Sequence, residues 1–171
     1  VVPQKGWLKQ MKELCEENNI LLILDEIQSG LGRTGELFAF NHEDIKPDGL
    51  ILGKALGGGL LPVSAFLSSR EIMNNFNPGS HGSTFGGNSL AAAVGIKSLD
   101  ILFEENLISN SYELGKYFLE ELQSLNFSYI KEVRGKGLWI GMEIQHPSIS
   151  AKDICKDLLK EKILEIGRAH V

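Results

Sequence analysis

Two linked segments decide the fold: ILLILDEIQSGLGRTG at residues 20–35 and DGLILGKALGGG at residues 48–59. Each contains an apolar run that leads into a polar residue, Asp25 in the first segment and, after Gly53, Lys54 in the second. Continuous apolar runs closed by turn residues are typical of strands buried on both faces of a sheet. Because ligands sit beyond the carboxyl ends of parallel strands, we expect Asp25 and Lys54 to reach the same rim.

Helices and strands are predicted to alternate over the first part of the chain. Helical or capping patterns cover residues 3–18, 69–76 and 88–103, and strand patterns cover residues 21–24, 49–52 and 63–67. This alternation favours an α/β fold with a mainly parallel sheet. Two glycine-rich stretches, residues 28–36 and 77–88, are predicted to be loops, and the second is long enough to suggest a function.

The pattern changes after residue 105. An amphipathic helix is predicted at residues 107–125, two β-like runs at 127–133 and 137–144, and a further helix from about Ser150. This helix–hairpin–helix order predicts the start of a second, smaller domain. We therefore expect residues 1–105 to form part of a large domain and residues 106–164 the start of a small C-terminal domain.

The two ends of the chain predict a fragment of a longer protein. Val1 is not a start residue, and the predicted final helix breaks into the string EIGRAHV at residues 165–171. One reading frame of a common sequencing-adapter oligonucleotide would encode that string. We therefore expect residues 165–171 to be a non-native tail, and resequencing the source DNA across this junction tests the expectation.

The composition excludes several classes of function. The chain has 17 basic and 22 acidic residues, a net charge of −5, which argues against nucleic acid or an anionic membrane as a partner. No apolar stretch approaches the roughly 20 residues of a membrane span. Cys15 and Cys155 are far apart and form no CxxC or Cys/His cluster, so two reduced, core-facing thiols in a cytoplasmic protein are favoured over a disulfide or a metal site.

Asp25 and Lys54 each have an ordinary interpretation. A lysine at a strand end is usually a solvated surface residue, and an aspartate there is often a turn or cap residue. Together, however, an amine and a carboxylate match the needs of pyridoxal phosphate. That cofactor takes a Schiff-base lysine and a carboxylate at its pyridinium nitrogen. The pair therefore predicts a pyridoxal phosphate site.

Three more residues could complete this site. Gln28 could turn back toward the cofactor ring and contact its phenolic oxygen, or it could be a surface loop residue. Ser83 and Thr84 lie in HGSTFGGN at residues 81–88, where hydroxyls and free backbone N–H groups suit a phosphate. A polar turn ahead of a helix explains these two residues equally well.

Other polar residues have weaker chemical interpretations. His81 has no partner at the spacing of metal ligands. Arg33 and Arg134 could meet substrate carboxylates, but structural or exposed roles are favoured. The string GKG at residues 135–137 is no Walker motif, because the upstream glycine and the following Ser or Thr are missing.

Three motifs in this order resemble the class III pyridoxal phosphate-dependent aminotransferases: DEIQSGLGRTG (25–35), PDGLILGKALGGG (47–59) and PGSHGSTFGGN (78–88). The resemblance spans about residues 1–160. Within the class, ILGKALGGG, PVSA and EVRGKGLWIG are most similar to the bacterial enzymes that use ornithine. Ser89 stands where the family usually has proline after GGN, which should alter only the start of a helix.

The resemblance implies a fold-type I transferase and assigns a role to each candidate residue. Lys54 would hold pyridoxal 5'-phosphate covalently and then move a proton between substrate and cofactor. Asp25 would pair with the pyridinium nitrogen, and Gln28 would contact the ring oxygen. Ser83 and Thr84 would reach the cofactor phosphate of the other subunit, because these enzymes are homodimers with shared active sites.

The resemblance also implies a reaction. The δ-amino group of ornithine would pass to 2-oxoglutarate, giving glutamate semialdehyde and glutamate. Acetylornithine or another ω-amino acid is the alternative donor, and a truncated product without catalysis is an alternative of another class. Several family site residues, including the arginines for substrate carboxylates, lie outside this stretch. We therefore expect the isolated chain to be inactive.

Overall fold

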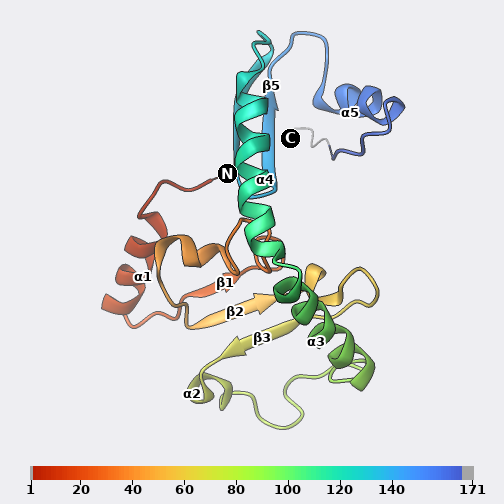
Figure 1. Cartoon of the computed structure of the whole chain (residues 1–171). Helices are drawn as coiled ribbons and strands as arrows, with labels where there is room; N and C mark the ends of the chain where they lie inside the picture. Colours follow the sequence, from red (N-terminus) through yellow and green to blue (C-terminus); the bar gives the residue numbers. More distant parts are fainter. Residues whose placement is uncertain (1, 167–171) are drawn as a thin grey trace.

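The computed structural model describes residues 2–166 as an α/β part followed by a helix, a hairpin and a last helix (Figure 1). In chain order the elements are α1 (Trp7–Glu17), β1 (Ile23–Asp25), η1 (Ala39–Glu43), β2 (Gly49–Leu52), η2 (Lys54–Gly57), β3 (Ala65–Ser68), α2 (Arg70–Met73), α3 (Ser89–Glu104), α4 (Leu107–Ser124), β4 (Ile130–Lys136), β5 (Trp139–Ile144) and α5 (Ala151–Lys160), where η marks 3₁₀ turns. The predicted non-native tail falls mostly on residues 167–171, which lie outside the described residues.

The first sheet has the strand order β1–β2–β3. Strands β1 and β2 are parallel, with Asp25 opposite Ile51, whereas β2 and β3 are antiparallel, with Leu52 opposite Ala65. The prediction of a mainly parallel sheet therefore holds for β1 and β2 but not for β3. A parallel connection needs a crossover, usually a helix, but here the chain turns back through η2 beside the strand it has just left.

The two predicted buried strands differ in exposure. Leu50 and Leu52 on β2 are buried at 8% and 6% exposure, because β2 is the middle strand. Ile23 on β1 is 48% exposed, because β1 forms an edge of the described sheet. On the other face of β2, Gly49 is buried and Ile51 is half-buried, so the prediction of burial on both faces holds for most of β2. It is wrong for β1 in this chain, where Ile23 and Asp25 are exposed.

The hydrophobic core lies where β2 runs into η2. It is formed by Leu50, Leu52 and Leu56, with Leu31, Phe38, Phe40, Val63, Ala65 and Leu99 packed against them. Burying one such leucine stabilises the fold by roughly 1.5–3 kcal/mol. Buried Gly95 of α3 lies beside Leu56 of η2, where a Cβ atom would be in ordinary van der Waals contact at 3.8 Å. Core packing of Leu56 therefore fixes the position of η2, the turn that carries Lys54.

The amino ends of β1 and β2 are tied to α1 by a partly buried ion pair. The Asp48 carboxylate accepts hydrogen bonds from Leu22 N at 2.8 Å and from Lys12 Nζ at 2.9 Å. The hydrogen bond from Lys12, and then the one from Leu22, lower the pKa of Asp48 below its ordinary 3.8. This edge lies opposite the carboxyl ends of the two strands, so it can stabilise the sheet without touching the rim.

Two helix starts agree with the sequence prediction. Asn88 Oδ1 accepts a hydrogen bond from Ala91 N at 2.8 Å, which caps α3. Ser150 and Asp153 form a reciprocal capping box at α5. Such side-chain caps satisfy backbone N–H groups that a helix start leaves without intrahelical partners.

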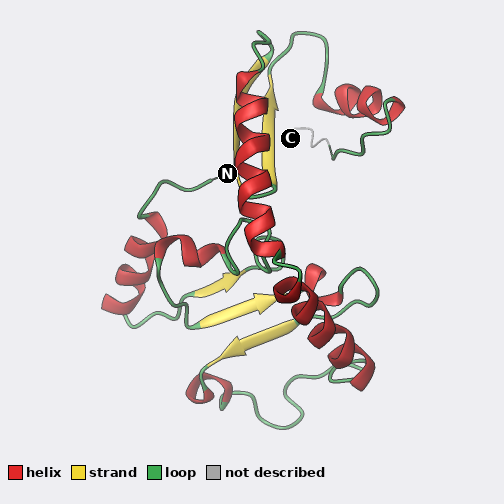
Figure 2. Ribbon diagram, in the orientation of Figure 1, coloured by secondary structure: helices red, strands yellow, loops and turns green. Residues whose placement is uncertain are grey.

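Helix α4 lies along the β4–β5 hairpin, as Figure 2 shows. The tip of this hairpin reaches the loop that follows β1: Leu138 N donates to Arg33 O at 3.1 Å. Ser111 Oγ from α4 donates to the same oxygen at 3.2 Å. The backbones pack so closely that a Cβ on Gly115 would lie 2.2 Å from Gly137 C. Across residues 2–166, no helix has both the length and the apolar surface needed to span a membrane.

Candidate active site

The candidate site lies at the carboxyl ends of β1 and β2. Asp25 is the last residue of β1, opposite Ile51 of β2, and Lys54 follows three residues later at the start of η2. The parallel register thus brings both strand ends, with Asp25 and Lys54, to one edge, as the sequence predicted. The segment from Asp25 to Phe40, here called the rim loop, continues from this edge.

Lys54 is presented to solvent by an unusual backbone conformation. Its φ is +45°, in the left-handed region, which costs a non-glycine residue roughly 1–2 kcal/mol. Buried Gly53 precedes it, and a Cβ there would lie 3.3 Å from Ile27 of the rim loop. Lys54 Nζ donates to Gln28 Oε1 at 3.1 Å, and within residues 2–166 no carboxylate forms an ion pair with it. The amine is therefore accessible for a covalent bond.

Asp25 begins the rim loop with a local turn. Its Oδ1 accepts a hydrogen bond from Ile27 N at 3.0 Å. This aspartate turn directs the chain away from the strand. Gln28, one residue after Ile27, then reaches Lys54. The exposed carboxylate, the amide and the amine therefore come from one continuous edge of the molecule.

Glu26 holds the rim loop, and the sequence prediction missed it. It is only 4% exposed, and its carboxylate accepts hydrogen bonds from Ala39 N at 2.8 Å, Phe40 N at 2.9 Å and Ser29 Oγ at 3.0 Å. A buried carboxylate is costly unless it is satisfied in this way. No local pattern indicates that the chain returns to Glu26 more than ten residues later, so only the fold reveals this contact.

His42 braces the rim loop from η1. Its Nε2 lies 3.1 Å from Thr34 O and 3.2 Å from Thr34 Oγ1. Burial, and then the nearby Lys136 ammonium, lower the pKa of His42 below its ordinary 6.5. The neutral imidazole is therefore the favoured form at neutral pH, so His42 adds no charge to the rim.

Ser83 and Thr84 lie elsewhere, on the exposed glycine loop of residues 77–88 between α2 and α3. The contacts of this loop are short-range, such as Gly86 N to Ser83 O at 3.2 Å. Among the described residues, no hydrogen bond joins Ser83 or Thr84 to Lys54, Gln28 or Asp25. The predicted site thus has two halves, the rim residues and the glycine loop. No direct polar contact joins them within residues 2–166 of this chain.

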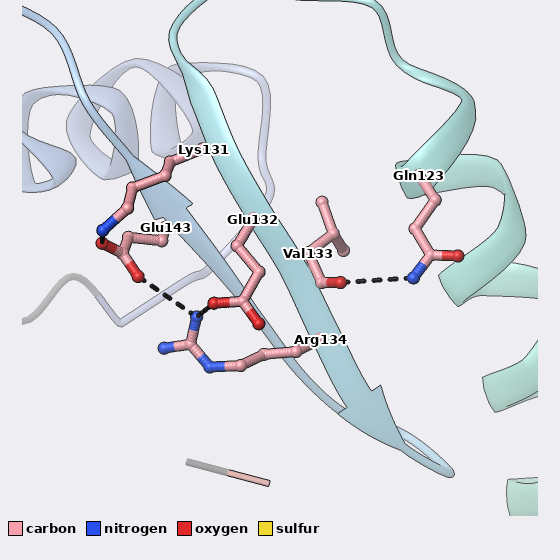
Figure 3. A network of polar contacts seen from close by, with 6 residues as sticks. All are labelled: Gln123, Lys131, Glu132, Val133, Arg134 and Glu143. Carbon is pink, nitrogen blue, oxygen red and sulfur yellow. Dashed lines mark hydrogen bonds and ion pairs between the residues drawn. The ribbon is translucent and has the colours of Figure 1, made fainter.

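The remaining polar candidates have structural contacts. Figure 3 shows the Arg134 guanidinium between Glu132 at 2.7 Å and Glu143 at 3.4 Å on the β4–β5 hairpin. Arg33 is exposed, and its backbone oxygen accepts a hydrogen bond from Leu138 N at the hairpin tip. The His81 ring packs edge-on against Phe76, with ring centres 6.0 Å apart.

The rim residues fit pyridoxal phosphate by the chemistry of their side chains. An accessible amine can bind an aldehyde, a carboxylate nearby can hold a proton on a ring nitrogen, and an amide can orient a ring oxygen. Lys54, Asp25 and Gln28 supply these three groups from one edge. The rim can therefore anchor such a cofactor, while the glycine loop could supply phosphate ligands only from another position.

Comparisons with known proteins agree with this chemistry. The class III aminotransferase family matches residues 1–170. Ornithine aminotransferase from Oceanobacillus iheyensis is 52% identical over 171 residues, which are 100% of this chain and 42% of that protein. The chain thus spans less than half the length of this relative.

Solved structures give the same result. The Toxoplasma gondii ornithine aminotransferase, reported with partial occupancy of pyridoxal phosphate at its active site, aligns with a TM-score of 0.93 and 43% identity over 96% of this chain and 39% of that one. Acetylornithine aminotransferase from Elizabethkingia anophelis aligns with a TM-score of 0.91 and 47% identity over 95% and 42%. Class III aminotransferases depend on pyridoxal phosphate and have a fold-type I architecture. The chain therefore belongs to the class III aminotransferase family.

Proposed function

We propose that this chain carries the cofactor-anchoring part of a pyridoxal phosphate-dependent ornithine aminotransferase. The reaction moves the δ-amino group of ornithine to 2-oxoglutarate, giving glutamate semialdehyde and glutamate. The observation that carries the proposal is the rim, where Lys54 Nζ lies 3.1 Å from Gln28 Oε1 beside the strand end at Asp25. Relatives named ornithine aminotransferase that are about half identical to the chain support this choice of donor.

Each rim residue has a separate task. Pyridoxal phosphate, when bound, supplies an aldehyde carbon that takes up amines and a ring that accepts electrons. Lys54 Nζ would anchor the cofactor and then, as a free amine, would move a proton from the amine-bearing carbon of the donor to the former aldehyde carbon of the cofactor. The Asp25 carboxylate keeps a proton on the ring nitrogen, and Gln28 orients the ring through its phenolic oxygen. In the second half of the reaction the same amine would move a proton from that cofactor carbon to the carbon of the oxo acid that receives the amino group.

The proposal includes a homodimer, in which Ser83 and Thr84 bind the cofactor phosphate of the partner subunit. Residues 106–164 would begin a small C-terminal domain, and residues 165–171 would be non-native. A cytoplasmic location belongs to the same proposal and is supported by the bacterial aminotransferases that the chain resembles.

Acetylornithine is the second candidate donor. The Elizabethkingia anophelis acetylornithine aminotransferase is 47% identical to this chain, so the rim chemistry does not separate the two donors. The isolated 171-residue chain is proposed to be inactive. Measurable transamination by that chain alone would contradict this part of the proposal.

The experiment uses the complete protein that contains this chain, purified with pyridoxal phosphate. The visible absorption band of the bound cofactor is followed while ornithine, or in a parallel sample N-acetylornithine, is added without any oxo acid. Loss of the band with ornithine supports the proposed function, and loss only with N-acetylornithine supports the second candidate. A protein without any such band would refute the assignment of Lys54.

A further inference from the structure

Glu26, in the rim loop, is the one acidic side chain that is buried among residues 2–166, and it has no cationic partner in any described ion pair. At 4% exposure, its carboxylate is satisfied by two backbone N–H groups of η1 and the Ser29 hydroxyl. A carboxylate removed from water is costly unless several donors compensate it, and three donors do so here. The fold thus keeps a charged group where an apolar side chain would be the ordinary choice.

The contacts of Glu26 close the rim loop on itself. Its side chain reaches Ala39 and Phe40 at the far end of the loop, while Glu26 N donates to Ile51 O of β2 at 2.9 Å. One residue therefore joins the end of β1, the neighbouring strand and η1. Gly30 N also donates to Glu26 O at 3.0 Å, which folds the first turn of the loop against this residue.

The two rim residues that serve the cofactor flank Glu26. Asp25 precedes it directly, and Gln28 lies two residues after it, within hydrogen-bond distance of Lys54. A catalytic group works only if neighbouring residues hold it within about 0.5 Å of its productive position. Because Glu26 is fixed on both its backbone and its side chain, it determines where the side chains on either side of it can lie.

We propose that Glu26 is a positioning residue, whose buried carboxylate holds the rim loop so that Asp25 and Gln28 face the cofactor anchored on Lys54. This inference rests on the proposed function. Glu26 itself touches neither substrate nor cofactor in this assignment. Its effect passes through the geometry of the two residues that flank it.

The test compares Glu26→Gln with Asp48→Asn in the complete protein loaded with pyridoxal phosphate. Glutamine keeps the size of the side chain but turns one acceptor into an NH₂ donor, which cannot accept a hydrogen bond from Ala39 or Phe40. Asp48 is a matched control, because it also accepts a backbone N–H and a second donor, but at the opposite ends of β1 and β2. Both variants should lower the thermal midpoint of unfolding.

Only the rim variant should change the cofactor and its chemistry. For Glu26→Gln we expect the pH midpoint of the visible cofactor band to shift by about half a pH unit or more. We also expect kcat to fall about tenfold with little change in KM, because displaced catalytic groups lose rate rather than ground-state binding. Faster amide hydrogen exchange in the peptide spanning η1 should accompany these changes. Asp48→Asn should leave the pH midpoint of the band unchanged. Its kcat should stay within about twofold of wild type.

The outcomes separate this inference from the proposed function. A wild-type protein without a cofactor band overturns both. A wild-type protein that reacts with ornithine, together with a Glu26→Gln variant that keeps the wild-type band midpoint and kcat, overturns the positioning role alone. Equal changes in Glu26→Gln and Asp48→Asn would also overturn it, since they would show a purely structural effect. If Glu26→Gln does not fold, Ser29→Ala removes one donor to the same carboxylate and should shift the band midpoint in a smaller degree, whereas an unchanged midpoint contradicts the role.

Discussion

The rim loop and the glycine loop carry the two halves of the predicted site but are built differently. The rim loop is braced by contacts distant in sequence, from Glu26 to Ala39 and from Arg33 to Leu138. Within residues 2–166, the hydrogen bonds of the glycine loop are all local, such as Ser80 Oγ to Asn77 O at 2.7 Å. A segment braced by its own chain can hold Asp25 and Gln28 beside the Lys54 amine before any ligand arrives. A segment without such bracing needs its ligand, or another part of the assembly, to fix it.

The largest effect on the chemistry of the rim is expected for Lys54→Ala in the complete protein. We expect the covalent cofactor band to disappear and kcat to fall at least about 10³-fold, because anchor and base are lost together. Stopped-flow absorbance and steady-state kinetics measure the two effects. Lys97→Ala is the control, since Lys97 is an exposed lysine of α3 that pairs with Glu104 at 3.3 Å. Comparable losses in both variants would contradict the role of Lys54.

Glycine-to-alanine substitutions compare the packing of the two regions. Gly137 meets the rim loop so closely that a Cβ would lie 2.4 Å from Thr34 C, and its φ is +54°. Gly137→Ala should therefore lower the free energy of unfolding by about 3 kcal/mol or more. Gly79→Ala in the glycine loop also has a positive φ, +84°, but meets nothing within 4 Å, so only about 1 kcal/mol is expected. Urea unfolding measures both, and equal losses would show that the rim loop is not more tightly packed.

Removing hydroxyls from the glycine loop should affect ligand binding without affecting the fold. Thr84→Ala should raise the dissociation constant for pyridoxal phosphate about tenfold, the effect of one lost hydrogen bond to a charged group. Its thermal midpoint without cofactor should equal that of wild type, because Thr84 is exposed. Ser80→Ala in the same loop is the control, and its cofactor affinity should not change. A Thr84→Ala variant with wild-type affinity would remove this loop from the site.

The smallest effect is expected at the amino ends of the strands, which are braced like the rim loop but lie away from it. Lys12 lowers the pKa of Asp48, so the ion pair stabilises the folded state above the unfolded pKa of about 3.8 and this contribution is lost as the pH falls through the lower folded pKa. Asp48→Asn should cost about 1 kcal/mol at neutral pH, since the two side chains are only 14% and 26% exposed. Thermal unfolding between pH 7 and about pH 2 should show the difference from wild type shrinking at the acid end. A difference that stays constant with pH would mean that the charge of Asp48 contributes nothing to the stability.

The sequence predicted those features that depend on neighbours along the chain. The bounds of β2, the cap of α3 at Asn88 and the start of α5 near Ser150 follow from local apolar runs and capping residues. The common edge of Asp25 and Lys54 follows from two parallel strands, so it was predictable as well.

The features that the sequence did not predict depend on contacts across space. The antiparallel direction of β3 depends on which way the chain turns after η2. The burial of Glu26 depends on the contact of its side chain with η1, which follows more than ten residues later. The close approach of Gly115 to Gly137 depends on how the tip of the β4–β5 hairpin packs against α4. The roles of Ser83 and Thr84 stay predictions, because no contact within the described chain brings them to Lys54.

The most direct test of the central claim is to locate the covalent anchor of the cofactor. The complete protein is loaded with pyridoxal phosphate, reduced with borohydride to make the bond to the lysine permanent, digested and mapped by mass spectrometry. We predict that the reduced cofactor is found on the peptide containing Lys54 and on that lysine alone. Attachment to a different lysine, or no attachment at all, would contradict the account of the rim as the cofactor site.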